Sequence, residues 1–125
     1  MLIVDDNHDS AELLALVLGR EGHETRVAYD PQEAIPLAHS FRPQIALLDI
    51  GLPGMDGFQL LEILRGLPDL AGCQFVAVTG YEEDAIGGTL ARGFDAHLRK
   101  PIDLNAVVGL VLDLGQAQLA KPASA

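Results

Sequence analysis

Short apolar segments alternate along the chain with longer segments of helical pattern, and this alternation limits the possible folds more than any other feature. The short segments are rich in β-branched and aliphatic residues, which is typical of strands buried on both faces. Five strands are expected over residues 2–5, 25–29, 44–49, 75–79 and 96–99, and five helices over 9–21, 31–40, 57–66, 83–92 and 103–114. Strict alternation predicts an α/β domain with a doubly wound five-stranded parallel sheet and helices on both of its faces.

The chain has 125 residues, which fits one domain and is too short for two ordinary ones. We expect the domain to span residues 1–115. The segment 116–125 is predicted to be a tail or the start of a linker, because it is rich in Ala and Gln and lacks an apolar period.

Charge and composition exclude several classes of function. Asp and Glu number 18 against 8 Lys and Arg, so the net charge of −10 argues against binding to nucleic acid or to an anionic membrane. No apolar run reaches the roughly 18 residues of a membrane span, and no signal peptide is visible. Cys73 is the only cysteine, which excludes an internal disulfide. We therefore expect a cytoplasmic protein.

Local signals predict several helix ends. Asp9 with Glu12 is interpreted as a capping box, and Asp30 as an N-cap before a proline at the first helical position. Asp56 and Asp103 are expected to cap the two helices that follow them. Pro36 should shorten or kink its helix, and Gly109 should weaken the last one by about 1 kcal/mol relative to Ala.

Chemically active side chains gather where the expected strands end. Asp5 and Asp6 end the first strand, Asp49 the third, Thr79 the fourth, and Lys100 follows the fifth. Ligands of open α/β sheets bind outside the carboxyl ends of the strands, so these groups should meet at one edge. Three close carboxylates need a bound cation or raised pKa values, and a hard divalent ion such as Mg²⁺ satisfies them.

Each of these residues also has an ordinary structural interpretation. A single aspartate at a strand end is usually a cap or a solvated loop residue, and Thr79 alone would be an ordinary strand threonine. Lys100 before Pro101 could be a surface lysine before a turn, although a cis bond would aim its side chain inward. The combination at several strand ends is what favours a functional site.

With these residues placed, the chain resembles a receiver domain of the response regulators of two-component signalling. The resemblance rests on the segments Leu-Ile-Val-Asp-Asp-Asn (2–7), Leu-Leu-Asp-Ile-Gly-Leu-Pro-Gly-Met-Asp-Gly (47–57), Val-Thr-Gly (78–80) and Leu-Arg-Lys-Pro (98–101), in this order over nearly the whole chain. It implies a flavodoxin-like strand order 2-1-3-4-5.

The resemblance also implies the roles of the site residues. Asp49 would accept a phosphoryl group from a phosphohistidine of a histidine kinase or of a histidine phosphotransfer domain. Asp5 and Asp6 would bind Mg²⁺ (or Mn²⁺) together with Asp49, one of them through water, and Gly51 would contribute its backbone carbonyl. Lys100 would pair with the phosphoryl group, and Thr79 would move onto it as part of a switch. Such a domain is not an enzyme with an external substrate, but it catalyses its own phosphorylation and dephosphorylation.

The sequence departs from the common family pattern beside the site. His97 stands where the family often has a Tyr or Phe as the second switch residue, so the switch could become sensitive to pH, unless His97 is only a tolerated planar side chain. Gly51 leaves the phosphoryl position without a covering side chain, and Tyr81 could cover it instead. The phosphoryl group could therefore live either longer or shorter than is common in the family.

Two further function classes compete with a phosphoaccepting switch. A phosphohydrolase with an aspartyl-phosphate usually has a second acidic residue two positions after its nucleophile, where this chain has Gly51. A non-phosphorylated receiver-like protein-binding module usually lacks an acidic residue or the lysine, and this chain keeps all of them. The segment 94–101 is similar to receivers fused to sensor kinases, although a free-standing regulator is the alternative. Leu13 on the first helix is a candidate contact for the phosphodonor.

Overall fold

The sheet has the strand number, direction and order that the sequence predicts. The computed structural model describes residues 1–52, 54–80 and 93–120, the last five of these by backbone alone. All five strands are parallel, in the order β2-β1-β3-β4-β5. They are β1 (Leu2–Val4), β2 (Arg26–Ala28), β3 (Ile45–Asp49), β4 (Gln74–Thr79) and β5 (Ala96–Arg99).

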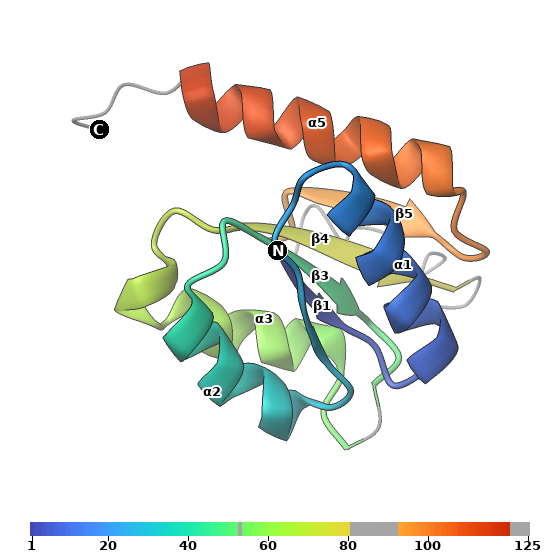
Figure 1. Cartoon of the computed structure of the whole chain (residues 1–125). Coiled ribbons are helices and arrows are strands. Elements are labelled where there is room, and N and C mark those ends of the chain that lie inside the picture. Colours follow the sequence, from blue (N-terminus) through green and yellow to red (C-terminus); the bar gives the residue numbers. More distant parts are fainter. Residues whose placement is uncertain (53, 81–92, 121–125) are drawn as a thin grey trace.

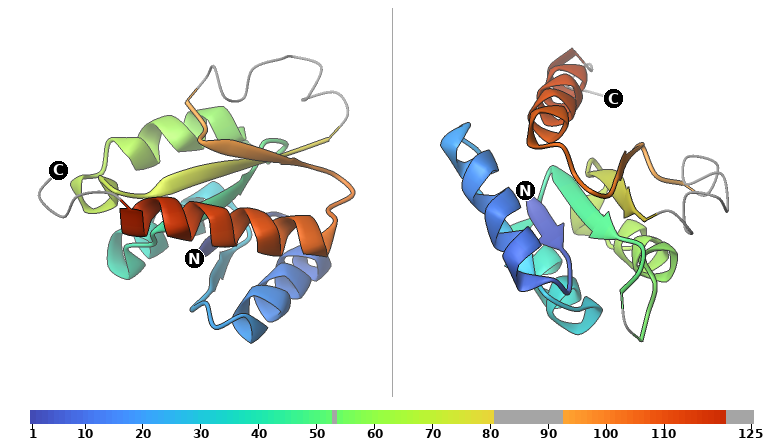
Figure 2. Two further views of the ribbon diagram at one scale, coloured as in Figure 1. Left: turned by 90° about the horizontal axis from the view of Figure 1, so that it is seen from above. Right: turned by 90° about the vertical axis from the view of Figure 1, so that its right-hand side faces the viewer.

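Helices cover both faces of this sheet, as Figure 1 shows. The described residues form four α-helices, α1 (His8–Arg20), α2 (Pro31–Phe41), α3 (Gly57–Arg65) and α5 (Leu104–Ala120), and a short 3₁₀ helix, η1 (Pro68–Leu70). Helices α1 and α5 lie on one face, and α2 and α3 lie on the other, which the two views of Figure 2 confirm. The helix expected over 83–92 lies outside the described residues.

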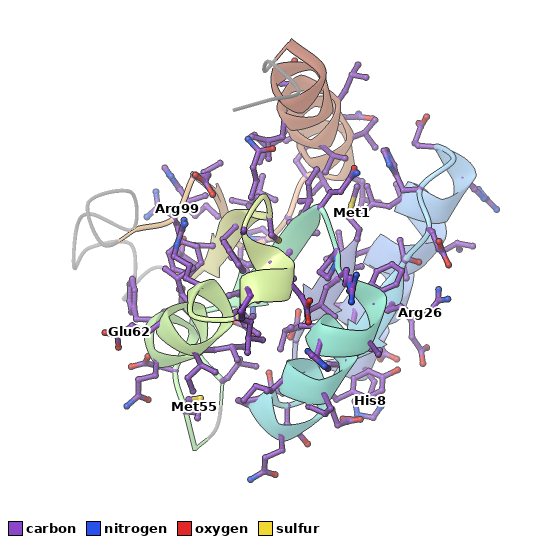
Figure 3. All side chains as sticks on the ribbon, turned by 90° about the vertical axis from the view of Figure 1, so that its left-hand side faces the viewer. Met1, His8, Arg26, Met55, Glu62 and Arg99 are labelled. Carbon is purple, nitrogen blue, oxygen red and sulfur yellow. The ribbon has the colours of Figure 1, made fainter. Side chains whose placement is uncertain are left out.

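Two apolar cores, one on each face, explain why the strands are apolar throughout. Successive residues of a strand point to opposite faces. In β3, Leu47 packs with the residues of α1 and α5, whereas Leu48 packs with those of α2 and α3. Both leucines are fully buried. Charged side chains such as Arg26 and Glu62 point away from the body of the molecule (Figure 3).

Several predicted caps are present. The Asp30 side chain accepts from the Glu33 N–H at the start of α2, and Asp56 forms a reciprocal capping box with Gln59 at the start of α3. Asp103 accepts from the Asn105 N–H before α5. These bonds satisfy backbone donors that have no partner within the helix.

Three predictions about the helices need correction. Asn7, not Asp9, caps α1, because α1 begins at His8 and Asn7 accepts from the Ser10 N–H. Pro36 does not shorten its helix, since α2 continues to Phe41, although a proline gives up one backbone hydrogen bond. Helix α5 runs to Ala120, beyond the helix end predicted at residue 114. The Ala, Gln and Leu residues beyond that point are good helix formers, which outweigh Gly115.

Candidate functional site

The carboxyl edge of the sheet brings the predicted acidic residues together. Asp5 and Asp6 follow β1 and Asp49 ends its neighbour β3, and carboxylate oxygens of all three lie within 4.8 Å of one another. Asp5 and Asp49 are only 3% and 4% exposed, whereas Asp6 is exposed to solvent. The sheet order creates this cluster, because β1 and β3 are hydrogen-bonded neighbours although their residues are far apart in the sequence.

Lys100 supplies a positive charge to this cluster. Its Nζ lies 2.9 Å from Asp49 Oδ2, and its backbone N–H donates to the Thr79 carbonyl at 2.7 Å. The Lys100–Pro101 peptide bond is cis. Burial lowers the pKa of Lys100, but the hydrogen bond to Asp49 and the charges of all three aspartates outweigh burial and raise it above its usual value. The ammonium group therefore stays charged beside Asp49 at neutral pH.

Asp5 is the carboxylate that the crowding affects most clearly. Burial raises the pKa of Asp5, and the neighbouring Asp49 acts in the same direction. The Asn7 N–H, which donates to Asp5 Oδ1 at 3.0 Å, and the charge of Lys100 oppose this rise. The site therefore carries more negative charge, from three carboxylates, than the single ammonium group of Lys100 can balance.

Thr79 is fully buried at the end of β4, next to the cluster along the sheet edge. Its Oγ1 donates to the Leu98 carbonyl of β5 at 3.4 Å. Thr79 is thus close to the site in the fold, and its hydroxyl is engaged with the neighbouring strand.

The backbone after β3 approaches the site closely. The Gly51 N–H donates to Asp49 Oδ1 at 3.0 Å, and the Gly57 N–H donates to the Ile50 carbonyl at 3.0 Å. A Cβ at Gly57 would lie 2.8 Å from both the Asp49 carbonyl oxygen and the Ile50 Cα. Only glycine lets α3 begin this near to Asp49.

A hollow of about 310 Å³ adjoins the acidic cluster between α1 and the segment after β5. Leu13 lies on its rim and is 47% exposed. The hollow is lined by Asp5, Asn7, Ser10, Leu13, Leu14, Lys100, Pro101, Ile102 and Leu104. This surface combines apolar side chains with direct access to charged groups.

Other predicted residues lie away from the cluster or outside the described part of the chain. His97 on β5 is exposed to solvent, and Tyr81 lies outside the described residues. Cys73 is buried, and burial raises the pKa of its thiol to about 12, which disfavours the reactive thiolate. Asn7 was not among the predicted residues, although asparagine is one of the preferred residues at a helix N-cap.

Fold and site together define a receiver domain, and the chain belongs to the response-regulator receiver domain family, whose family model matches residues 1–112. It is 32% identical over 108 residues to sporulation initiation phosphotransferase F of Bacillus subtilis, covering 86% of each protein. An uncharacterised 14.6 kDa protein of Leptolyngbya boryana is 36% identical over 113 residues, which are 89% of this chain and 86% of that protein.

Longer relatives and solved structures agree with this assignment. The DNA-binding response regulator MtrA of Mycobacterium tuberculosis is 33% identical over 111 residues, which cover 89% of this chain and only 48% of MtrA. The chain thus spans about half the length of MtrA. A CheY-like receiver domain of Methanospirillum hungatei superposes with a TM-score of 0.83 at 30% identity, covering 94% of this chain and 93% of that one. Among the described residues, no helix has both the length and the apolar character needed to cross a membrane.

Proposed function

We propose that this receiver domain accepts a phosphoryl group on Asp49 from a phosphohistidine of a histidine kinase or of a histidine phosphotransfer domain. A carboxylate oxygen of Asp49 attacks phosphorus, the bond between phosphorus and the imidazole nitrogen breaks, and an acyl phosphate results. The observation that carries the proposal is the meeting of three carboxylates and one ammonium group at the sheet edge, with Lys100 Nζ 2.9 Å from Asp49.

The donor set at this edge suits a hard divalent cation, Mg²⁺ or Mn²⁺. Carboxylate oxygens are the preferred ligands of Mg²⁺, which also retains water and bridges to phosphate. Asp5, Asp6 and Asp49 would hold the ion, and the backbone carbonyl of Gly51 would complete the protein ligands. The bound ion would neutralise charge that develops on the phosphoryl oxygens.

The remaining site residues act on the phosphoryl group after transfer. Lys100 holds a fixed positive charge at Asp49 and would pair with a phosphoryl oxygen. Thr79 would exchange its 3.4 Å bond to the Leu98 carbonyl for a bond to the phosphoryl group. Because Leu98 belongs to β5, this exchange would pass the state of the site to the strand that carries His97.

The phosphodonor is expected to dock over the hollow beside the cluster. Leu13 offers exposed apolar surface on α1 at this hollow, which Lys100 and Asp5 also line. A docked partner would exclude water from the reacting groups, which strengthens the electrostatic interactions within the site.

The experiment that tests the proposal is intact mass spectrometry after incubation with acetyl phosphate and Mg²⁺. We expect one phosphoryl adduct, labile to hydroxylamine, that is absent from Asp49→Asn and from a sample with EDTA. A folded protein that binds Mg²⁺ but shows no adduct would next be titrated with beryllofluoride. Failure to bind beryllofluoride would reject the phosphoaccepting role and favour a non-phosphorylated binding module.

A further inference from the structure

Two stacked rings lie beside the acidic cluster on its β2 side. His8 is the first residue of α1, and its ring stacks on that of Tyr29, which follows β2 directly. The ring centroids are 3.7 Å apart and the planes differ by 13°. Figure 3 labels His8 at the margin of the molecule, beside the ribbons of α1 and α2. The proposed phosphoryl transfer uses neither residue.

Tyr29 is hydrogen-bonded to residues in the N-terminal halves of two helices. Its hydroxyl donates to Glu12 Oε1 on α1 at 3.3 Å, and its backbone N–H donates to Glu33 Oε1 on α2 at 3.2 Å. Loss of hydration raises the pKa of Tyr29, and the two glutamates act in the same direction. The hydroxyl therefore remains a donor, and Tyr29 couples the start of α1 to the end of β2.

The segment that these contacts hold is the one that carries Asp5 and Asp6. At its beginning, the Asp5 N–H donates to the carbonyl of Ala28, the residue before Tyr29, at 3.1 Å. At its end, His8 stacks on Tyr29 itself. Two consecutive residues at the end of β2, Ala28 and Tyr29, thus contact the two ends of the segment 5–8.

We propose that His8 and Tyr29 are positioning residues for the cation site formed by Asp5 and Asp6, an inference that rests on the proposed function. Asp6 is exposed, so its place in the cluster depends on the position of its backbone. Holding that backbone in advance reduces the conformational entropy that cation binding would otherwise lose. The stack is therefore expected to increase cation affinity without touching the cation.

The first test is isothermal titration of Mg²⁺ into the wild type and four variants at one pH and ionic strength. We expect His8→Ala and Tyr29→Ala to raise the Kd for Mg²⁺ about threefold to tenfold, because each removes the stacked pair. His8→Phe should restore most of the affinity, since it keeps a ring without an ionisable group. His39→Ala is the control, because His39 is an exposed histidine on α2 that pairs with Asp69, and its Kd should equal that of the wild type.

The second test needs no cation. The Asn7 N–H donates to the Asp5 carboxylate, so its hydrogen exchange reports the order of the segment. We expect faster exchange of this amide in His8→Ala than in wild type or His39→Ala, with equal global stability. If the wild type binds Mg²⁺ and the folded His8→Ala variant has the same Kd and the same exchange rate of the Asn7 amide, the positioning role is overturned. The proposed cation site is upheld by that result. A wild type without measurable Mg²⁺ affinity would instead refute the proposed cation site, and the positioning role with it.

Discussion

At the scale of single residues, the charge balance around Asp49 decides how the site behaves. Burial raises the pKa of Asp5, and Asp49 adds to this effect. A carboxyl group whose pKa is higher in the folded than in the unfolded state stabilises the fold only while it is protonated. Its contribution is lost as the pH rises through the folded pKa, so at neutral pH the ionised Asp5 works against folding.

Asp5→Asn should therefore stabilise the protein in the absence of divalent cations. At pH 7 in EDTA we expect an increase of about 1 to 2 kcal/mol in the free energy of unfolding, measured by urea denaturation. Adding Mg²⁺ should stabilise the wild type but not this variant, because a ligand stabilises only the state that binds it. Asp113→Asn, on the exposed surface of α5, controls for the change in net charge. It should leave the stability in EDTA unchanged and should still be stabilised by Mg²⁺. A lower stability of Asp5→Asn in EDTA would contradict the prediction.

The sequence places these residues at the edge of the sheet because each one directly ends or follows an expected strand. Asp5, Asp49, Thr79 and Lys100 all lie at the expected edge, and the structure brings them together. The stack between His8 and Tyr29 is different in kind. It joins the ends of two neighbouring strands through side-chain geometry, and no local pattern in the sequence encodes such a contact.

At the scale of elements, the entry into α3 depends on one glycine. A Cβ at Gly57 would lie 2.8 Å from backbone atoms of the residues that end β3 and follow it. Backbone cannot swing aside as a flexible side chain can, so either α3 or the Asp49 segment must shift. The helix start and the position of the proposed phosphoacceptor are thus mechanically linked.

Gly57→Ala should lower both stability and phosphorylation. We expect a loss of about 1 to 3 kcal/mol in urea denaturation, as for other overpacked sites, and slower labelling by acetyl phosphate in the folded variant. Gly109→Ala is the matched control within α5, where a Cβ would meet nothing within 4 Å. This second change should stabilise by about 0.5 to 1 kcal/mol, since alanine favours a helix. Equal effects of the two substitutions would disprove the link.

Leu13→Arg should impair transfer from a phosphorylated partner while leaving labelling by acetyl phosphate unchanged. Leu13 is on the proposed docking rim, whereas a small phosphodonor needs no such surface. The transfer rate to the variant, measured with the phosphorylated partner, should fall at least about tenfold, which corresponds to 1.4 kcal/mol. Ile63→Arg on α3 is the control, because Ile63 has the same size as leucine and is 38% exposed. Equal transfer rates in both variants would remove Leu13 from the contact.

Helices are predicted correctly where the apolar periodicity of the sequence agrees with the packing of the helix. The predictions are less accurate at the helix ends. The apolar spacing of α1 favours Leu14, Val17 and Leu18 as its core face, with Leu13 beside that face. Leu14 and Leu18 are buried, Val17 is half-buried, and Leu13 is 47% exposed. The end of α5 was wrong because intrinsic helix propensity extends the helix beyond the last apolar repeat. The cap of α1 was wrong because two adjacent capping signals compete, and only the structure shows that Asn7 prevails.

At the scale of the whole molecule, the fold carries a net charge of −10 on a single small domain. Self-repulsion of this size destabilises a compact state, and the site adds three of the negative charges at one edge. The alternation of strands and helices predicts the parallel sheet, whereas the strand order was expected from the resemblance to receiver domains.

A monovalent salt should therefore stabilise the protein in EDTA by screening alone, without binding at the cation site. We expect the melting temperature to rise by a few degrees between about 0.02 and 0.5 M NaCl at pH 7, as screening shortens the range of repulsion. The rise should be gradual, whereas the effect of Mg²⁺ should saturate at low concentration because it fills a site. A melting temperature that falls with NaCl would show that attractive ion pairs dominate.

The pairing of Asp49 with Lys100 spans 51 residues of the chain, and this has a consequence for biosynthesis. The ribosome adds about 5 to 20 residues per second, so Asp49 is made about 3 to 10 seconds before Lys100, and Asp5 and Asp6 are made earlier still. During that interval, the growing chain carries the three carboxylates without the lysine that pairs with Asp49. The proposed site is thus completed late in translation, once the segment after β5 has been made.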